Sequence, residues 1–163
     1  GETVTYSIVD GANGRKEGRG TMPMNLWKKT LGQMRKSAKQ VVFVDEGRIT
    51  ADSFAVMYNS TSSTGFPVWS TPGNWFDGPD ARHGDGTTLS FADGHSEYWK
   101  WCLETANYGR LVESSLPGAP PYDFPLSAPT PQPDAAYQDL YRMTLGYWGQ
   151  IGFSVPGHPP KVE

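Results

Sequence analysis

The sequence is poor in cysteine, in charge and in long apolar runs. Its single cysteine, Cys102, cannot form a disulfide within the chain, so the cysteine count does not identify a cellular compartment. Charged residues make up only 19% of the chain and the formal net charge is −3, a balance that excludes a general attraction to nucleic acid or to a membrane surface. No apolar run reaches the roughly 18–20 residues of a membrane-spanning helix.

Glycine, proline and aromatic residues are abundant in the sequence, in contrast to charged residues. The chain has 19 glycines and 14 prolines, and 13% of its residues are aromatic. This composition is typical of a turn-rich fold that contains β-sheet, and it argues against a helical bundle. A length of 163 residues is enough for one domain with a substantial buried core.

Hydrophobic periodicity predicts an α+β fold with an antiparallel sheet. Thr87, Leu89 and Phe91 alternate with small or polar neighbours, which is typical of a strand with one buried face. The complete set of expected strands lies near residues 3–9, 40–45, 54–58, 87–92 and 95–101, and a helix is expected near 25–37.

The chain divides into three stretches. Residues 1–116 carry the predicted sheet. Residues 117–134 contain seven prolines and are expected to be an extended insert. Residues 135–163 are expected to form a helix, with Asp134 as a candidate N-cap, and a frayed tail. We expect this last stretch to pack on the same domain as the sheet.

The strongest local signal is a hairpin over residues 83–101. Asp93-Gly94 separates two strand-like runs, and Asp-Gly is a favoured pair for a two-residue type I′ turn, in which both central residues have positive φ. Such a turn allows one register only, because a slip by one residue would turn every side chain to the other face.

Four residues in or beside this hairpin are candidate metal ligands: His83, Asp85, Asp93 and His95. Histidine with carboxylates suits zinc or another transition metal, whereas calcium prefers oxygen ligands alone. Their spacing matches neither His-Glu-x-x-His nor a calcium loop, and the first two precede the hairpin's first strand. The structural alternative is that Asp93-Gly94 makes the turn and His83 hydrogen-bonds to backbone groups of the hairpin.

Four further residues are candidates for binding a ligand, and each also has a structural interpretation. Asp45 and Glu46 end a buried strand and can be ligands, although acids in this position more commonly accept backbone N–H bonds. Trp69 and Trp75 lie in a Gly/Pro/Ser-rich connection, where burial of their rings can pin the loop to the body or exposure can contact a ligand. No residue is assigned a catalytic role, because the serines near the turn lack a Gly-x-Ser-x-Gly pattern.

The hairpin resembles that of a bacterial family of prepilin-type, pilin-like proteins, which includes type II secretion pseudopilins. His83, nine further residues and then Asp93-Gly94 is the spacing that defines the family. The closing Trp101 and the "FVDE" segment at residues 43–46 match further family features. "VTYSI" at 4–8 and "DLYRM" at 139–143 resemble the family's first strand and late helix.

The resemblance implies a non-enzymatic structural subunit of a type II secretion or type IV pilus filament. Family members have a leader cut by a prepilin peptidase, an apolar helix that anchors them in the inner membrane, and a β-sheet head in the periplasm or at the cell surface. The expected partners are copies of the chain, other pseudopilins and an inner-membrane assembly platform. We expect this chain to be the head of a longer precursor. No cofactor is required, but calcium can bind near the sheet, with Asp85 and Asp93 as candidate ligands.

Two other functions stay open at this point. The chain can be an extracellular module that binds carbohydrate or another ligand through Trp69 and Trp75. It can also be a metal-dependent hydrolase, which would require His83, Asp93 and His95 to converge in an open cleft.

Overall fold

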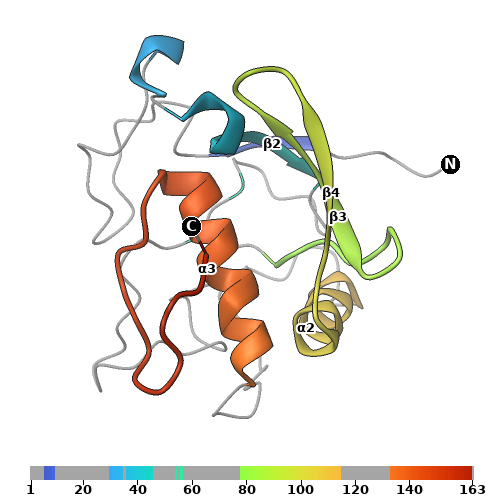
Figure 1. The fold of residues 1–163 in the computed structure, drawn as a ribbon. Helices are drawn as coiled ribbons and strands as arrows, with labels where there is room; N and C mark the ends of the chain where they lie inside the picture. The colour runs from blue at the N-terminus through green and yellow to red at the C-terminus, as the bar shows by residue number, and fades with distance from the viewer. Residues whose placement is uncertain are drawn as a thin grey trace, which may run out of the picture.

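The computed structural model describes residues 6–9, 30–34, 36–45, 54, 56, 78–114 and 133–162. Four strands form one antiparallel sheet in the order β1-β2-β3-β4, and two α-helices accompany it, so the fold is α+β as predicted (Figure 1). The elements are β1 (Tyr6–Ile8), η2 (Leu31–Gln33), η3 (Ser37–Lys39), β2 (Val41–Asp45), β3 (Gly86–Phe91), β4 (Ser96–Lys100), α2 (Leu103–Ser114) and α3 (Asp134–Trp148). Within the described segments, no helix is both long enough and apolar enough to cross a membrane.

The predicted hairpin forms from β3 and β4. Its register pairs Ser90 with Ser96 and Thr88 with Tyr98. The alternation in β3 has the expected effect, since Leu89 is fully buried and Phe91 is nearly so. Side chains that alternate along a strand point to opposite faces of the sheet, so these two residues line the core face.

Helix α3 covers the core face of the sheet (Figure 1). A Cβ on Gly146 would lie 2.9 Å from a methyl group of Val41, so only glycine lets the helix approach β2 this closely. The side chain of Gln40 donates hydrogen bonds to the carbonyls of Gly146 and Tyr147, at 3.0 and 2.6 Å. The other face of the sheet presents three aromatic residues that are 44–58% exposed, namely Tyr6, Phe43 and Tyr98.

Two of the expected elements are different in the structure. In the described part of the helix expected near 25–37, the chain forms two short 3-10 turns instead of an α-helix. Gly32 and Ser37 are weak helix formers, which accounts for the interruption. Of the expected strand 54–58, the structure describes Phe54 and Val56, and Phe54 makes an isolated, parallel bridge with Val9.

The C-terminal stretch is better ordered than predicted. Val155 is buried, and its N–H donates to the hydroxyl of Tyr141 at 2.7 Å. The ammonium of Lys161 lies 2.6 Å from Asp134, so the tail packs back along α3 and the prediction of fraying is wrong. Asp134 is the first residue of α3, and Pro133 occupies the N-cap position without a side-chain cap. The proline-rich insert lies outside the described residues up to position 132.

Candidate functional site

The turn of the β3–β4 hairpin has three residues, so the predicted two-residue type I′ turn is wrong. Phe91 donates its N–H to the carbonyl of His95 at 2.9 Å, and Gly94 donates to the carbonyl of Phe91 at 3.0 Å. Gly94 has φ of 94°, whereas Asp85 is the only non-glycine residue in the described segments with positive φ. The loop is therefore a type I turn followed by a left-handed glycine. Asp93 keeps an ordinary backbone conformation and accepts the N–H of His95 at 3.2 Å.

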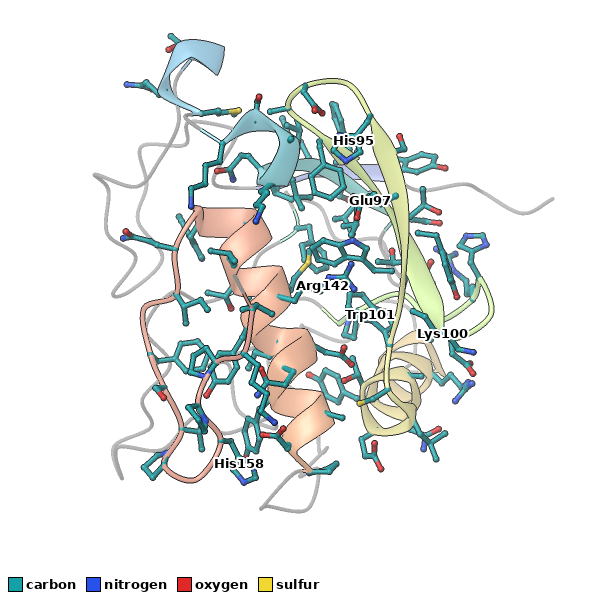
Figure 2. The ribbon with its side chains drawn as sticks, in the orientation of Figure 1. His95, Glu97, Lys100, Trp101, Arg142 and His158 are labelled. Atoms are coloured by element: carbon teal, nitrogen blue, oxygen red, sulfur yellow. The ribbon has the colours of Figure 1, made fainter. Side chains whose placement is uncertain are left out.

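A small polar cluster lies at this turn (Figure 2). His95 Nδ1 is 2.5 Å from Asp93 Oδ1, and Nε2 is 3.3 Å from Glu97 Oε1. The imidazole also stacks on the ring of Phe91, with centroids 4.4 Å apart. The hydrogen bond with Asp93 raises the pKa of His95, and the same contact lowers the pKa of Asp93.

The segment that precedes β3 lies at the opposite end of the hairpin, beside α2 (Figure 1). Gly84 and Asp85 both have positive φ, at 69° and 67°. A Cβ on Gly86 would lie 2.3 Å from the carbonyl oxygen of Trp99, so glycine is needed for close approach of β4. Arg110 of α2 forms an ion pair with Asp85. The positive φ of Gly84, the close approach of β4 to Gly86 and the ion pair of Asp85 explain why these three residues precede β3.

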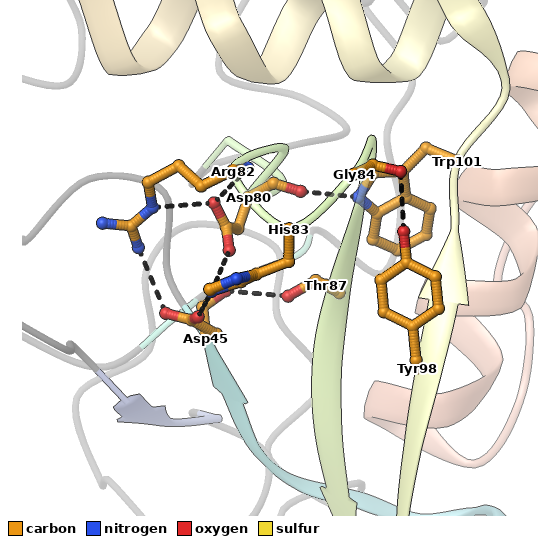
Figure 3. Close-up of polar contacts among 8 residues, drawn as sticks. All are labelled: Asp45, Asp80, Arg82, His83, Gly84, Thr87, Tyr98 and Trp101. Atoms are coloured by element: carbon orange, nitrogen blue, oxygen red, sulfur yellow. Dashed lines mark hydrogen bonds and ion pairs between the residues drawn. The ribbon is translucent and has the colours of Figure 1, made fainter.

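Helix α2 and the end of β4 together position Asp80. The indole N–H of Trp101 donates to the carbonyl of Asp80 at 2.7 Å (Figure 3). On α2, a Cβ at Gly109 would lie 2.3 Å from the carbonyl oxygen of Pro79, so this glycine lets the helix touch the backbone next to Asp80. The backbone of Asp80 is therefore fixed from two sides.

Asp80 meets three residues from two different segments (Figure 3). Arg82 donates from Nε to Asp80 Oδ1 at 3.0 Å and from a terminal nitrogen to Asp45 Oδ1 at 3.1 Å. Nε2 of His83 lies 2.6 Å from Asp45 Oδ2 and 3.7 Å from Asp80 Oδ2. Arg82 thus occupies one oxygen of each carboxylate, and His83 faces the other oxygen of each. Thr87 of β3 also donates its hydroxyl to the carbonyl of Asp45 at 3.0 Å.

Both carboxylates are deeply buried, whereas the two cationic partners reach solvent. The side chains of Asp45 and Asp80 are 2% and 0% exposed, compared with 39% for Arg82 and 54% for His83. Burial and then the negative charge of Asp80 raise the pKa of Asp45, and they outweigh the opposite effects of His83 and Arg82. Among the residues that the structure describes, Asp80 Oδ2 has no hydrogen-bond partner.

This cluster ties two parts of the fold together, and it also presents a potential metal-ligand set. Asp45 belongs to β2, while the other charged members precede β3, so the ion pairs hold the end of one strand to the segment that begins the hairpin. One ligand atom each from Asp45, Asp80 and His83 lie within 4.8 Å of one another.

The structure does not bring together the four metal-ligand candidates taken from the sequence. His83 pairs with Asp45, and Asp85 pairs with Arg110, at one end of the hairpin. Asp93 and His95 pair with each other at the other end, and six residues of β3 separate the two groups. A single site from these four residues is therefore a wrong prediction, and so is convergence of His83, Asp93 and His95 in one cleft. Glu46, Trp69 and Trp75 lie outside the described residues.

Sequence reasoning missed Asp80 and Arg82. The one available signal was an acid three positions before the motif histidine, on a segment too irregular to predict. Cys102 shows no sign of activation, because burial raises the pKa of its thiol and its sulfur contacts the hydroxyl of Thr105 at 3.3 Å. The serines beside the turn, Ser90 and Ser96, contact each other at 3.2 Å.

A hollow of about 260 Å³ lies between the hairpin and α3. Arg142 of α3 sits 3.9 Å above the ring of Trp99 and 3.9 Å from the carboxylate of Glu97 (Figure 2). The guanidinium covers the ring of Trp99, and the two aromatic residues that line the hollow, Trp99 and Phe91, are each only 5% exposed. This arrangement offers no open ring on which a sugar can stack.

Comparisons of the chain with protein-family models, with curated proteins and with solved structures found no match.

Proposed function

We propose that the chain is the head of a pilin-like or pseudopilin-like subunit, which assembles into a type II secretion or type IV pilus filament and catalyses no reaction. The observation that carries the proposal is the pairing of His83 with Asp45 at 2.6 Å. Both residues belong to the segments on which the family resemblance rests. Their contact joins the histidine of the motif to the upstream "FVDE" strand.

The remaining motif residues also serve the scaffold. Gly94 supplies the positive φ of the turn, and Asp93 accepts the N–H of His95. Trp101 fixes the backbone of Asp80. A subunit that repeats along a filament needs a sheet with one defined register, and a tight turn with ion-paired strand ends supplies it.

The exposed sheet face supplies a surface for contacts between heads. Phe43 and Tyr98 are 44% and 49% exposed on neighbouring parts of this face. Large exposed aromatic residues of this kind are enriched where proteins associate. In the proposal, the partners are copies of the chain and other pseudopilins in the periplasm or at the cell surface. The prepilin peptidase and the inner-membrane assembly platform act on a segment that precedes the head.

Cysteine cross-linking in the source cells tests the assembly. Phe43→Cys and Tyr98→Cys, each in a Cys102→Ala background, should give disulfide-linked dimers after mild oxidation, because each variant has a single thiol. Lys161→Cys is a matched control, because its side chain is 66% exposed on the C-terminal tail, away from the sheet. Monomer alone from every variant, or as much dimer from the control, would contradict assembly through this face.

A further inference from the structure

We propose that Asp45, Asp80 and His83 form a binding site for a divalent transition-metal ion, with zinc as the best fit. The three ligand atoms are Oδ2 of each carboxylate and Nε2 of the imidazole. They come from the end of β2 and from the segment before β3, so a bound ion would link these two parts of the fold. The proposal is independent of assembly into a filament.

The division of the carboxylate oxygens supports the site. Arg82 hydrogen-bonds to Oδ1 of Asp45 and to Oδ1 of Asp80, at 3.1 and 3.0 Å. The two Oδ2 atoms are left on the side of His83. Arg82 also compensates one of the two negative charges, so one buried charge is left for a cation or for protonated His83. Without any cation, two ionised carboxylates this close would repel each other strongly.

The second and independent observation is the unpaired oxygen of Asp80. Its side chain is 0% exposed, and Oδ2 has no hydrogen-bond partner in the described segments. An unpaired oxygen of a buried carboxylate is costly, because neither water nor a donor replaces its lost hydration. Nε2 of His83 lies 3.7 Å from this oxygen, too far for a hydrogen bond. A metal ion between these two atoms would satisfy the oxygen.

The distances require only a small adjustment. Zinc bonds of about 2.1 Å in a tetrahedral site place neighbouring ligand atoms about 3.4 Å apart. The contact of Nε2 with Asp80 is close to this value at 3.7 Å, and the contact with Asp45 has to open from 2.6 Å. His83 is half-exposed, so its ring can make this movement and the ion can enter from solvent. Water would fill the fourth position.

The ligand chemistry selects the ion. A neutral imidazole offers one nitrogen lone pair when the other ring nitrogen carries the proton. One nitrogen and two carboxylate oxygens suit zinc and similar ions. Calcium requires six to eight oxygen ligands, and this set holds too few. The proposed zinc site is therefore separate from a calcium site at Asp85 and Asp93, which lie at opposite ends of the hairpin.

The test is a titration of the 163-residue chain with ZnCl₂, in competition with a coloured chelator. We expect one equivalent of Zn²⁺ to bind, with Ca²⁺ at least about a hundredfold weaker. Asp80→Asn retains the acceptor for Arg82 but removes the charge, and should weaken zinc binding at least about tenfold. Asp93→Asn is the matched control, because it changes the other aspartate that contacts a histidine, and should leave zinc binding unchanged.

NMR on the unmodified chain identifies the histidine that binds zinc, even if a variant fails to fold. In ¹⁵N spectra of the imidazoles, Zn²⁺ should shift Nε2 of His83 and leave the ring of His95 unchanged. The melting temperature should rise with zinc in the unmodified chain and in Asp93→Asn, but not in Asp80→Asn. The proposal is overturned if no zinc binds, if Asp80→Asn binds zinc as well as the unmodified chain does, if His95 takes the ion, or if calcium binds more tightly than zinc.

Discussion

The imidazole of His83 lies 2.6 Å from the carboxylate of Asp45, although the two residues are 38 positions apart in the sequence. The contact joins the end of β2 to the segment that begins the hairpin. Asp45 is almost fully buried there and His83 is half-exposed, so removal of the two partners should have unequal effects.

We expect Asp45→Ala to lower the free energy of unfolding by about 2 kcal/mol, because it removes the buried acceptor shared by His83 and Arg82. His83→Ala should cost less, roughly 1 kcal/mol, since water can partly replace an exposed imidazole. Urea denaturation with a metal chelator present measures both values. His95→Ala, at the hairpin turn, is the control and should cost less than either variant. Equal stability of all three variants would contradict a structural role for the contact.

Gly94→Ala should destabilise the chain by about 1–2 kcal/mol, which is the cost of placing an L-residue in the left-handed region. Space is not the reason, because a Cβ on Gly94 would meet nothing within 4 Å. Asp93→Ala is the discriminating control. In the three-residue loop, Asp93 has no positive φ and its replacement loses only the contacts with His95. A loss as large as that of Gly94→Ala, measured by thermal unfolding, would favour a two-residue type I′ turn instead.

Gly109→Ala tests how α2 positions Asp80. The added methyl would lie 2.3 Å from the carbonyl oxygen of Pro79, which is backbone and cannot rotate away. We expect a loss of about 1–3 kcal/mol, as in overpacked cores, and altered amide resonances for Asp80 and His83 in ¹H–¹⁵N spectra. Gly32→Ala has space for its methyl, with the nearest neighbour at 4.0 Å, and should change neither stability nor these resonances. An unperturbed Gly109→Ala would show that α2 does not hold this segment.

The histidine at the turn should titrate above its ordinary pKa of 6.5, because the carboxylate of Asp93 stabilises its charged form. NMR titration of the His95 ring measures this pKa. Asp93→Asn should return it toward 6.5, and Glu97→Gln should lower it less, since the contact of Glu97 is the weaker one. No change in Asp93→Asn would contradict the pairing.

The pairing of His95 with Asp93 also determines how the stability of the folded chain changes with pH. The stabilisation from charged His95 is fully present below 6.5 and is lost as pH rises through the raised pKa. The stabilisation from ionised Asp93 is present above 3.8 and is lost as pH falls through the lowered pKa. The stability difference between the unmodified chain and Asp93→Asn should therefore be largest between pH 3.8 and 6.5.

Local sequence signals predicted the hairpin but not the cluster beside it. The alternation around Leu89 and the Asp-Gly pair are contained within a few residues, so they could be recognised directly. The turn type was missed because Asp-Gly fits a two-residue turn and also the last two positions of a three-residue loop. The meeting of Asp45, Asp80 and His83 depends on strand pairing between distant segments, which no local pattern encodes. Helix α2 was missed because glycine and small polar residues weaken its apolar pattern.

The most direct test of the proposed filament subunit is the N-terminus of the native protein, determined by intact mass and terminal fragmentation after purification from the source cells. The proposal predicts a mature chain in which this head follows an N-methylated residue and an apolar helix of roughly twenty residues, long enough to span a membrane. A native chain that starts near residue 1, or after an ordinary secretory cleavage, would contradict the filament proposal. The scaffold and the zinc site would then have to be explained by a different function.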